Sequence, residues 1–402
     1  MEDIISQGGD RPPGGRRRRL LIVLAALVLA GLVLAEHLPR GGHPKPHASV
    51  AGGVQYGGGP ALIKLRDEAP HGPSGILGPT LTVAAGTRLP RTGAQPAWYW
   101  PAKGSVEPIG GLPDDRFGYV FTRLAGGWAI QPNPPDPAGC ADCPGPPAPI
   151  YYLGNHARLA ALVGPATMVA PAATPAELWL TMFPAAANLG TTSGQAREYS
   201  TGGTTQGPGV RLPVGYTIAQ GTTRGLLLAP VTTHAQAPDL LWNPYSGHTV
   251  RRFANVIAQS ANLIAYTPPC TTTCSLRVLN LATGHATTLT MAVGRTLTNA
   301  SISPDGRYLA LAVSFTEDGD DGALAMQLEV ANLGTGRVDP VPNTWVSSDA
   351  LDGFGWLGDG DNLVAELTFA TRVQLALWNP ASASLAVATV KPTAEPSALV
   401  VG

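Results

Sequence analysis

Charged residues are scarce in this chain of 402 residues: they make up 13% of it, about half the share of an ordinary soluble domain. The 26 Lys and Arg residues nearly balance the 27 Asp and Glu residues, so the formal net charge is −1. A nucleic-acid partner needs a basic surface, and this balance gives no electrostatic support for one. We therefore expect no nucleic acid among the partners.

Signatures of catalysis are also missing. The sequence has no G-x-S-x-G nucleophile elbow, no G-x-x-x-x-G-K phosphate loop and no H-E-x-x-H metal motif. The eight histidines are scattered, and His248 and His285 directly follow turn glycines, where a repeated turn explains them better than catalysis. The sequence therefore predicts no catalytic residue, no metal site and no cofactor.

One long apolar run lies near the N-terminus. Residues 16 to 19 are four arginines, and residues 20 to 35 are apolar without interruption. Because basic residues hold their end of an apolar helix in the cytoplasm, we expect a basic cytoplasmic tail over residues 1–19 and a transmembrane helix over 20–37. The run is short for a span, and a signal peptide cleaved near Ala35 is the alternative. Residues 38–59, rich in Gly and Pro, predict a flexible linker that leads outside the membrane.

Two short patterns recur through the rest of the chain at spacings of about 40 to 50 residues. In the first, a strand enters a turn at an asparagine, and the copies lie 37, 52 and 47 residues apart, at Asn243, Asn280, Asn332 and Asn379. In the second, a turn leads into a hydrophobic strand. The first strand residues of its copies are Trp128, Leu178, Leu226, Leu263, Leu309 and Leu363.

The clearest copy of the second pattern is Ser303-Pro304-Asp305-Gly306, with Leu309 three residues later. This S-P-D-G-x-x-L signature resembles the WD40-like, TolB-type β-propeller repeat. Two interleaved patterns with one period are typical of four-stranded propeller blades. We predict an all-β fold, a seven-bladed β-propeller over residues 60–402, preceded by the transmembrane helix. Six or eight blades are possible because insertions blur the spacing, and a tandem of β-sandwiches is the alternative fold.

The four cysteines form two close pairs, Cys140 with Cys143 and Cys270 with Cys274. In an oxidising compartment such pairs predict two local disulfides, each in the loop in the middle of its blade. A redox pair would need a helix N-terminus, which the prolines around Cys140 prevent. A four-cysteine zinc site would need the two pairs to meet, and the predicted blades separate them.

No residue pattern identifies a ligand. The acidic loop at residues 317–322 could offer oxygen atoms to calcium, although its spacing fits no EF-hand and a solvated loop tip is the better interpretation. We expect a membrane-tethered, extracytoplasmic module that binds a protein, a peptide or a cell-envelope glycan. The alternative is an exported propeller enzyme, such as a lyase, a glycosidase or a quinone-dependent dehydrogenase, with its site at the channel mouth.

Overall fold

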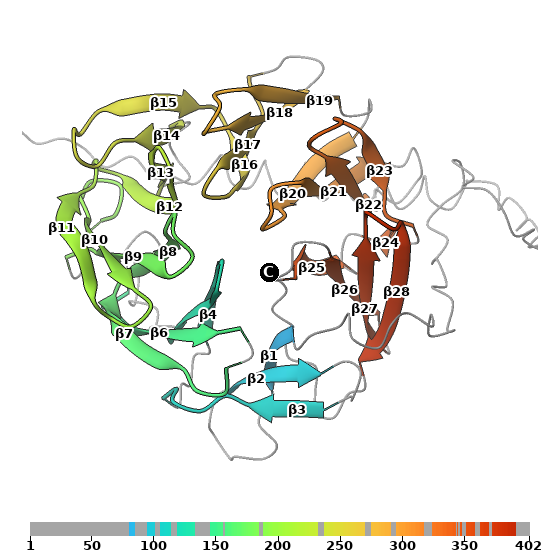
Figure 1. Ribbon diagram of the computed structural model, residues 1–402, viewed down its shortest axis with the longest axis horizontal. Coiled ribbons are helices and arrows are strands. Elements are labelled where there is room, and N and C mark those ends of the chain that lie inside the picture. The colour runs from blue at the N-terminus through green and yellow to red at the C-terminus, as the bar shows by residue number, and fades with distance from the viewer. Residues whose placement is uncertain are drawn as a thin grey trace, which may run out of the picture. The chain divides into compact units, whose positions relative to one another are not determined.

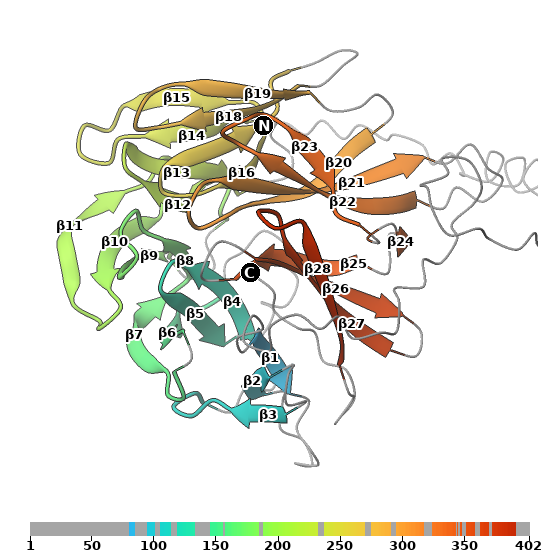
Figure 2. The ribbon, with the colours of Figure 1, turned by 45° about the vertical axis from the view of Figure 1, so that its right-hand side comes forward.

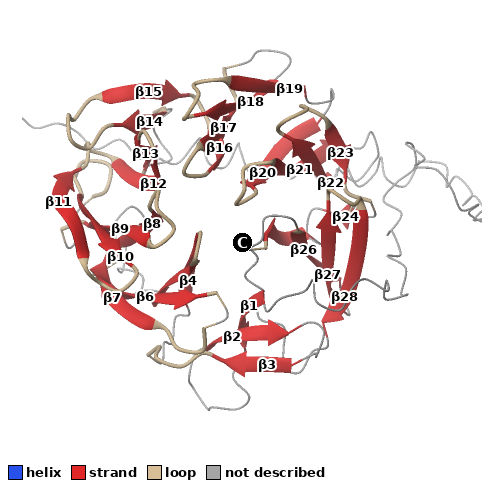
Figure 3. Ribbon diagram, in the orientation of Figure 1, coloured by secondary structure: helices blue, strands red, loops and turns tan. Residues whose placement is uncertain are grey.

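The computed structural model describes a succession of antiparallel sheets. The described residues lie within a compact unit that comprises residues 58–402. They are residues 80–84, 95–100, 105–113, 119–132, 145–155, 157–184, 188–231, 237–269, 275–290, 295–316, 324–342, 344, 346–347, 351–357, 362–369 and 372–390. These residues form strands and loops with no helix among them (Figure 3). None of them therefore belongs to an apolar helix of membrane-spanning length.

The strands form seven sheets, which we number in chain order. Sheet 1 consists of β1 (Thr80–Ala84), β2 (Gln95–Trp100) and β3 (Ser105–Pro108). Sheet 2 consists of β4 (Tyr119–Leu124), β5 (Gly127–Pro132), β6 (Ala148–Gly154) and β7 (Ala161–Ala166). Sheet 3 consists of β8 (Met168–Pro171), β9 (Glu177–Met182), β10 (Gln195–Ser200) and β11 (Thr205–Arg211). Sheet 4 consists of β12 (Tyr216–Thr222), β13 (Gly225–Pro230), β14 (Asp239–Trp242) and β15 (Thr249–Phe253).

The last three sheets follow the same plan. Sheet 5 consists of β16 (Val256–Gln259), β17 (Leu263–Tyr266), β18 (Ser275–Asn280) and β19 (Ala286–Thr290). Sheet 6 consists of β20 (Arg295–Ile302), β21 (Tyr308–Thr316), β22 (Leu324–Asn332) and β23 (Val338–Pro340), and β24 (Val346–Ser347) also pairs with β22. Sheet 7 consists of β25 (Leu351–Trp356), β26 (Leu363–Phe369), β27 (Arg372–Asn379) and β28 (Ser384–Val390).

The sheets are arranged as the blades of a β-propeller. Within sheets 2 to 7 the first four strands pair in chain order, and the first strands β4, β8, β12, β16, β20 and β25 lie toward the centre (Figure 1). Each sheet is twisted, as antiparallel sheets are, and its face turns toward the next sheet (Figure 2). The resemblance to WD40-like, TolB-type propellers is thus confirmed at the level of the fold. We call sheets 2 to 7 blades 2 to 7.

The predicted number of seven blades is corrected to six complete blades. Sheet 1 has three strands among the described residues, whereas each of the six blades has at least four. In sheet 1, β1 pairs with β2 and β2 with β3, and the sheet has no fourth strand among the described residues. The repeat patterns are weakest in this part of the sequence, so they do not distinguish a complete blade from a partial one.

Apolar side chains between successive sheets form the core. Six clusters of buried residues each join two neighbouring sheets. Between blades 3 and 4, for example, Trp179 packs with Leu228 and Trp242, which are 0% and 5% exposed. Burial of a leucine such as Leu228 contributes about 2 kcal/mol. Because the sheets carry apolar side chains on both faces, a single blade could not bury its own surface and needs neighbouring sheets to cover it.

The remaining predicted segments lie outside the described residues. These are the basic tail over residues 1–19, the helix or signal peptide over 20–37, the linker over 38–59 and the acidic loop over 317–322. The four cysteines also lie outside them. Both cysteine pairs fall between the second and third strands of a blade, since β5 ends at Pro132 before β6, and β17 ends at Tyr266 before β18. Their pairing stays a prediction.

Candidate functional site

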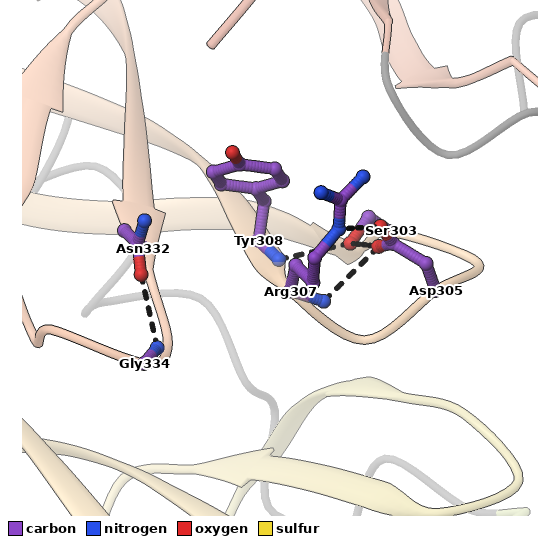
Figure 4. A network of polar contacts seen from close by, with 6 residues as sticks. All are labelled: Ser303, Asp305, Arg307, Tyr308, Asn332 and Gly334. Carbon is purple, nitrogen blue, oxygen red and sulfur yellow. Dashed lines mark hydrogen bonds and ion pairs between the residues drawn. The ribbon is translucent and has the colours of Figure 1, made fainter. Parts of the chain in front are cut away.

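The signature residues Ser303, Asp305 and Gly306 form a closed turn between β20 and β21. The Ser303 hydroxyl donates to the Asp305 carboxylate over 2.6 Å and accepts from the Tyr308 backbone N–H over 2.9 Å. Asp305 also accepts from the Arg307 backbone N–H over 3.0 Å and pairs with the Arg307 guanidinium (Figure 4). Gly306 has φ of 71°, a conformation that favours glycine. Burial tends to raise the pKa of Asp305, but the hydrogen bonds from Ser303 and Arg307, with the charge of Arg307, outweigh it and lower the pKa.

The other two signature residues are also structural. Pro304 is exposed within the turn, and Leu309, which is 0% exposed, is the second residue of β21 and packs between blades 5 and 6. The Leu333 backbone N–H donates to the Arg307 carbonyl over 2.9 Å, so this turn contacts the asparagine turn of the same blade. The hydrogen bonds of the Ser303 and Asp305 side chains all stay within blade 6. The signature marks the repeat and carries no site of its own.

At the opposite end of blades 2 to 6 lies the long connection between the second and third strands. Successive strands run antiparallel, so the loop between the second and third strands lies at the same end as the connection to the next blade. In blade 3 these two connections line an open depression with a volume of about 530 Å³. Its lining residues are Met182, Phe183, Pro184, Thr191, Thr192, Ser193, Gln195, Arg211 and Val214. We call it the blade 3 pocket.

Three strands of blade 3 end at this pocket. Gln195 at the start of β10 lies directly opposite Met182 on β9 and Arg211 on β11. Directly opposed residues of an antiparallel ladder project from the same face of the sheet, so these three side chains form a row. Phe183 closes the inner side; it is 3% exposed, and its backbone N–H donates to the Thr167 hydroxyl over 3.1 Å.

The pocket combines apolar surface with hydrogen-bonding groups. Met182 and Val214 are 36% and 55% exposed, values that leave apolar atoms open to solvent. Three hydroxyl groups, the Gln195 amide and the Arg211 guanidinium complete the lining. Sites of this composition bind through apolar contact and gain specificity from a few polar groups. The sequence patterns did not indicate this pocket, because its residues come from connections that differ from blade to blade.

Acidic groups lie elsewhere in blade 3. Burial raises the pKa of Glu198, and the nearby charge of Glu177 raises it further. Glu177 begins β9 and Met182 ends it, so these two carboxylates lie at the end of the blade away from the pocket. Within the described part of the chain, no group of three or more His, Cys, Asp or Glu side chains could hold a metal ion.

Comparisons with known proteins support no assignment beyond the fold. No protein-family model matches the chain, and no curated protein matches it significantly. Several solved structures are similar, at low identity. The periplasmic gluconolactonase of Pseudomonas aeruginosa shares 12% identity over 80% of this chain and 98% of its own, with a TM-score of 0.47. The β-propeller domain of the trilobed protease from Pyrococcus furiosus shares 9% identity over 75% and 91%, with a TM-score of 0.48. A protein assigned as a TolB of Agrobacterium tumefaciens shares 12% over 78% and 90%, with a TM-score of 0.36.

Proposed function

We propose that this protein is a membrane-tethered, extracytoplasmic β-propeller that binds a protein, a peptide or a cell-envelope glycan. The blade 3 pocket is the observation that carries the proposal. It offers exposed apolar atoms beside hydroxyl, amide and guanidinium groups at the end of the blade where the variable connections lie. Propellers present ligand-specific loops on a constant scaffold, because loops tolerate change that the packed blades do not.

The chemistry of the lining favours recognition over catalysis. Its potential nucleophiles are the hydroxyls of Thr191, Thr192 and Ser193. A hydroxyl at its ordinary pKa is a weak nucleophile and needs an adjacent base. The groups that line the pocket beside these hydroxyls are apolar, amide or guanidinium groups, which do not accept a proton at neutral pH. They can donate hydrogen bonds to a ligand and pack against it.

The tether is supported by the sequence. Four arginines followed by sixteen apolar residues favour an N-terminus held in the cytoplasm, with the rest of the chain outside. A protease added to intact cells should then degrade the propeller, and replacement of the four arginines by serine should reduce that degradation. Protection of the propeller in intact cells would contradict the extracytoplasmic location.

Binding is tested by capture from the cell envelope. The full-length protein, purified in detergent, is expected to retain a defined envelope component, identified by mass spectrometry. The variant Val214→Asp, which places a charge in the pocket, should lose that component. The matched control Val250→Asp changes an equally exposed valine, 57% exposed, on blade 4 and should keep it. Chemical turnover of the captured component, or equal capture by both variants, would contradict a binding role for this pocket.

A further inference from the structure

Two arginines of blade 3 lie on one face of the sheet beside the pocket. Arg197 is two residues after Gln195 on β10, so both side chains project from the same face. Arg211 lies opposite Gln195 on β11 and shares that face as well. Gln195 thus stands between two guanidinium groups on adjacent strands. Among the described residues, neither arginine forms an ion pair with a carboxylate.

Among the residues that the structure describes, no carboxylate pairs with the two arginines of this face. Arg197 and Arg211 are exposed. The nearest residue in sequence with a carboxylate, Glu198, alternates to the other face of β10. Gly209 lies under Arg197: a Cβ atom there would be 3.5 Å from two nitrogen atoms of the guanidinium. The Arg197 guanidinium thus lies next to the backbone of β11.

An apolar wall adjoins the two arginines. Met182 belongs to the same row as Gln195 and Arg211, and the exposed Val214 lies across the pocket. Guanidinium groups bind carboxylates in a fork geometry, and aliphatic surface favours an aliphatic side chain over a hydroxyl-covered sugar. A ligand that satisfies both must carry a negative charge next to an apolar group.

We propose that the blade 3 pocket binds an acidic peptide segment in which Asp or Glu alternates with an apolar residue. The acidic side chain accepts hydrogen bonds from Arg211 and Arg197, and the neighbouring apolar side chain enters the cavity between Met182 and Val214. This inference rests on the proposed binding function and names its partner class.

The test uses two dye-labelled hexapeptides with amidated ends, one with alternating Asp and Leu and one with alternating Asn and Leu. Fluorescence anisotropy measures their binding to the full-length protein in detergent. The Asp-Leu peptide should bind at least about tenfold more tightly than the Asn-Leu peptide, because each charge-assisted contact exceeds a neutral one. That preference should shrink as salt rises from about 0.05 M to about 0.5 M, since the charges are exposed.

Matched variants locate the site. Arg211→Gln and Arg197→Gln should each weaken Asp-Leu binding about tenfold and leave Asn-Leu binding unchanged. The control is Arg277→Gln, because Arg277 is exposed and, like Arg197, is the third residue of the third strand of its blade. It should bind both peptides as the unaltered protein does. Equal thermal midpoints for the three variants show that folding is intact.

Each other outcome overturns the inference. Equal affinity for the two peptides would show that binding does not require the negative charge. An equally large loss of Asp-Leu affinity in Arg277→Gln would show that the peptide does not bind specifically at the blade 3 pocket. Stronger competition by a soluble polyuronate than by peptide points to a glycan instead. Absence of peptide binding, with envelope capture retained, overturns the acidic peptide and leaves the proposed function standing; loss of capture as well overturns both.

Discussion

At the scale of single residues, asparagine side chains close the same turn in four successive blades. The side-chain oxygens of Asn243, Asn280 and Asn332 each accept two backbone N–H groups two and three residues later, over 2.9 to 3.1 Å. Asn379 accepts one such bond from Ser382 over 3.0 Å. Four residues after the first three asparagines stands a glycine with φ between 72° and 74°, whereas the fourth copy has Ala383 with φ of 50°. The asparagine side chain stabilises the turn, and glycine at the turn's last position adopts the left-handed conformation without strain.

This comparison predicts two substitutions of opposite effect. Ala383→Gly should raise the thermal midpoint, because it relieves a left-handed alanine that costs about 1 kcal/mol. Gly284→Ala should lower the midpoint by a similar free energy, and no atom lies within 4 Å of the added methyl group, so backbone strain alone is measured. Differential scanning calorimetry checks both. Two shifts of the same sign would show that the turns are not equivalent.

Asp305 predicts a dependence of stability on pH. Its pKa is lower in the folded protein than in the unfolded chain, so its stabilising contribution is complete above the unfolded pKa and is lost as pH falls through the folded pKa. Asp305→Asn should therefore lower the thermal midpoint at pH 7, and the difference from the unaltered protein should vanish between about pH 4 and about pH 2. Melting curves across that range test the prediction. A difference that stays constant with pH would exclude the charge of Asp305 as its cause.

At the scale of elements, the second strand of each blade could be predicted from sequence. Trp128, Leu178, Leu226, Leu263, Leu309 and Leu363, predicted as first strand residues, are the first or second residues of β5, β9, β13, β17, β21 and β26. All six are at most 7% exposed. The prediction succeeded because a tight turn and the strand it begins depend on neighbouring residues. The short signature therefore carried the necessary information.

Features that depend on distant residues could not be predicted. The blade 3 pocket needs Met182, Gln195 and Arg211 to come together by strand pairing, and no local pattern marks them. The bulges in β12, β16, β20 and β25 are also invisible in the sequence, because each is set by the strand it pairs with. Arg295 and Glu329 are 34 positions apart, and their buried ion pair follows from the fold of blade 6. The sequence periodicity therefore predicted the positions of the blades, but the pocket, the bulges and the buried ion pair follow from strand pairing between residues far apart in the sequence.

The ion pair of blade 6 gives a prediction at this scale. The side chains of Arg295 and Glu329 are 18% and 4% exposed, so removal of one partner leaves the other charge poorly solvated. Glu329→Leu should destabilise the protein by about 3 kcal/mol, measured by urea denaturation. The double variant Arg295→Met with Glu329→Leu should recover most of that loss, because two apolar side chains can replace a buried pair. Additive losses in the double variant would show that the two charges do not interact.

At the scale of the whole molecule, hydrogen bonds between neighbouring sheets add to the apolar clusters that join sheets 1 to 7 in succession. Arg224, in the turn between β12 and β13, donates to the carbonyl oxygens of Leu281 and Ala282 in blade 5 over 3.0 and 3.2 Å. The indole of Trp98 in sheet 1 donates to the Ala157 carbonyl next to blade 2 over 2.6 Å. At these two interfaces directional hydrogen bonds add to the non-directional burial of apolar side chains.

This succession of sheets predicts how the four cysteines pair. Cys140 and Cys143 belong to the connection within blade 2, and Cys270 and Cys274 to that within blade 5, with blades 3 and 4 between them in the ring (Figure 1). Peptide mapping without reductant should therefore find Cys140 linked to Cys143 and Cys270 linked to Cys274. Each disulfide closes a loop of few residues and contributes at most about 2 kcal/mol, so reduction should lower the thermal midpoint by about 5 °C or less. A disulfide between Cys140 and Cys270 would require a connection of blade 2 to reach one of blade 5. Blades 3 and 4 separate these two blades, so finding that disulfide would contradict the propeller arrangement.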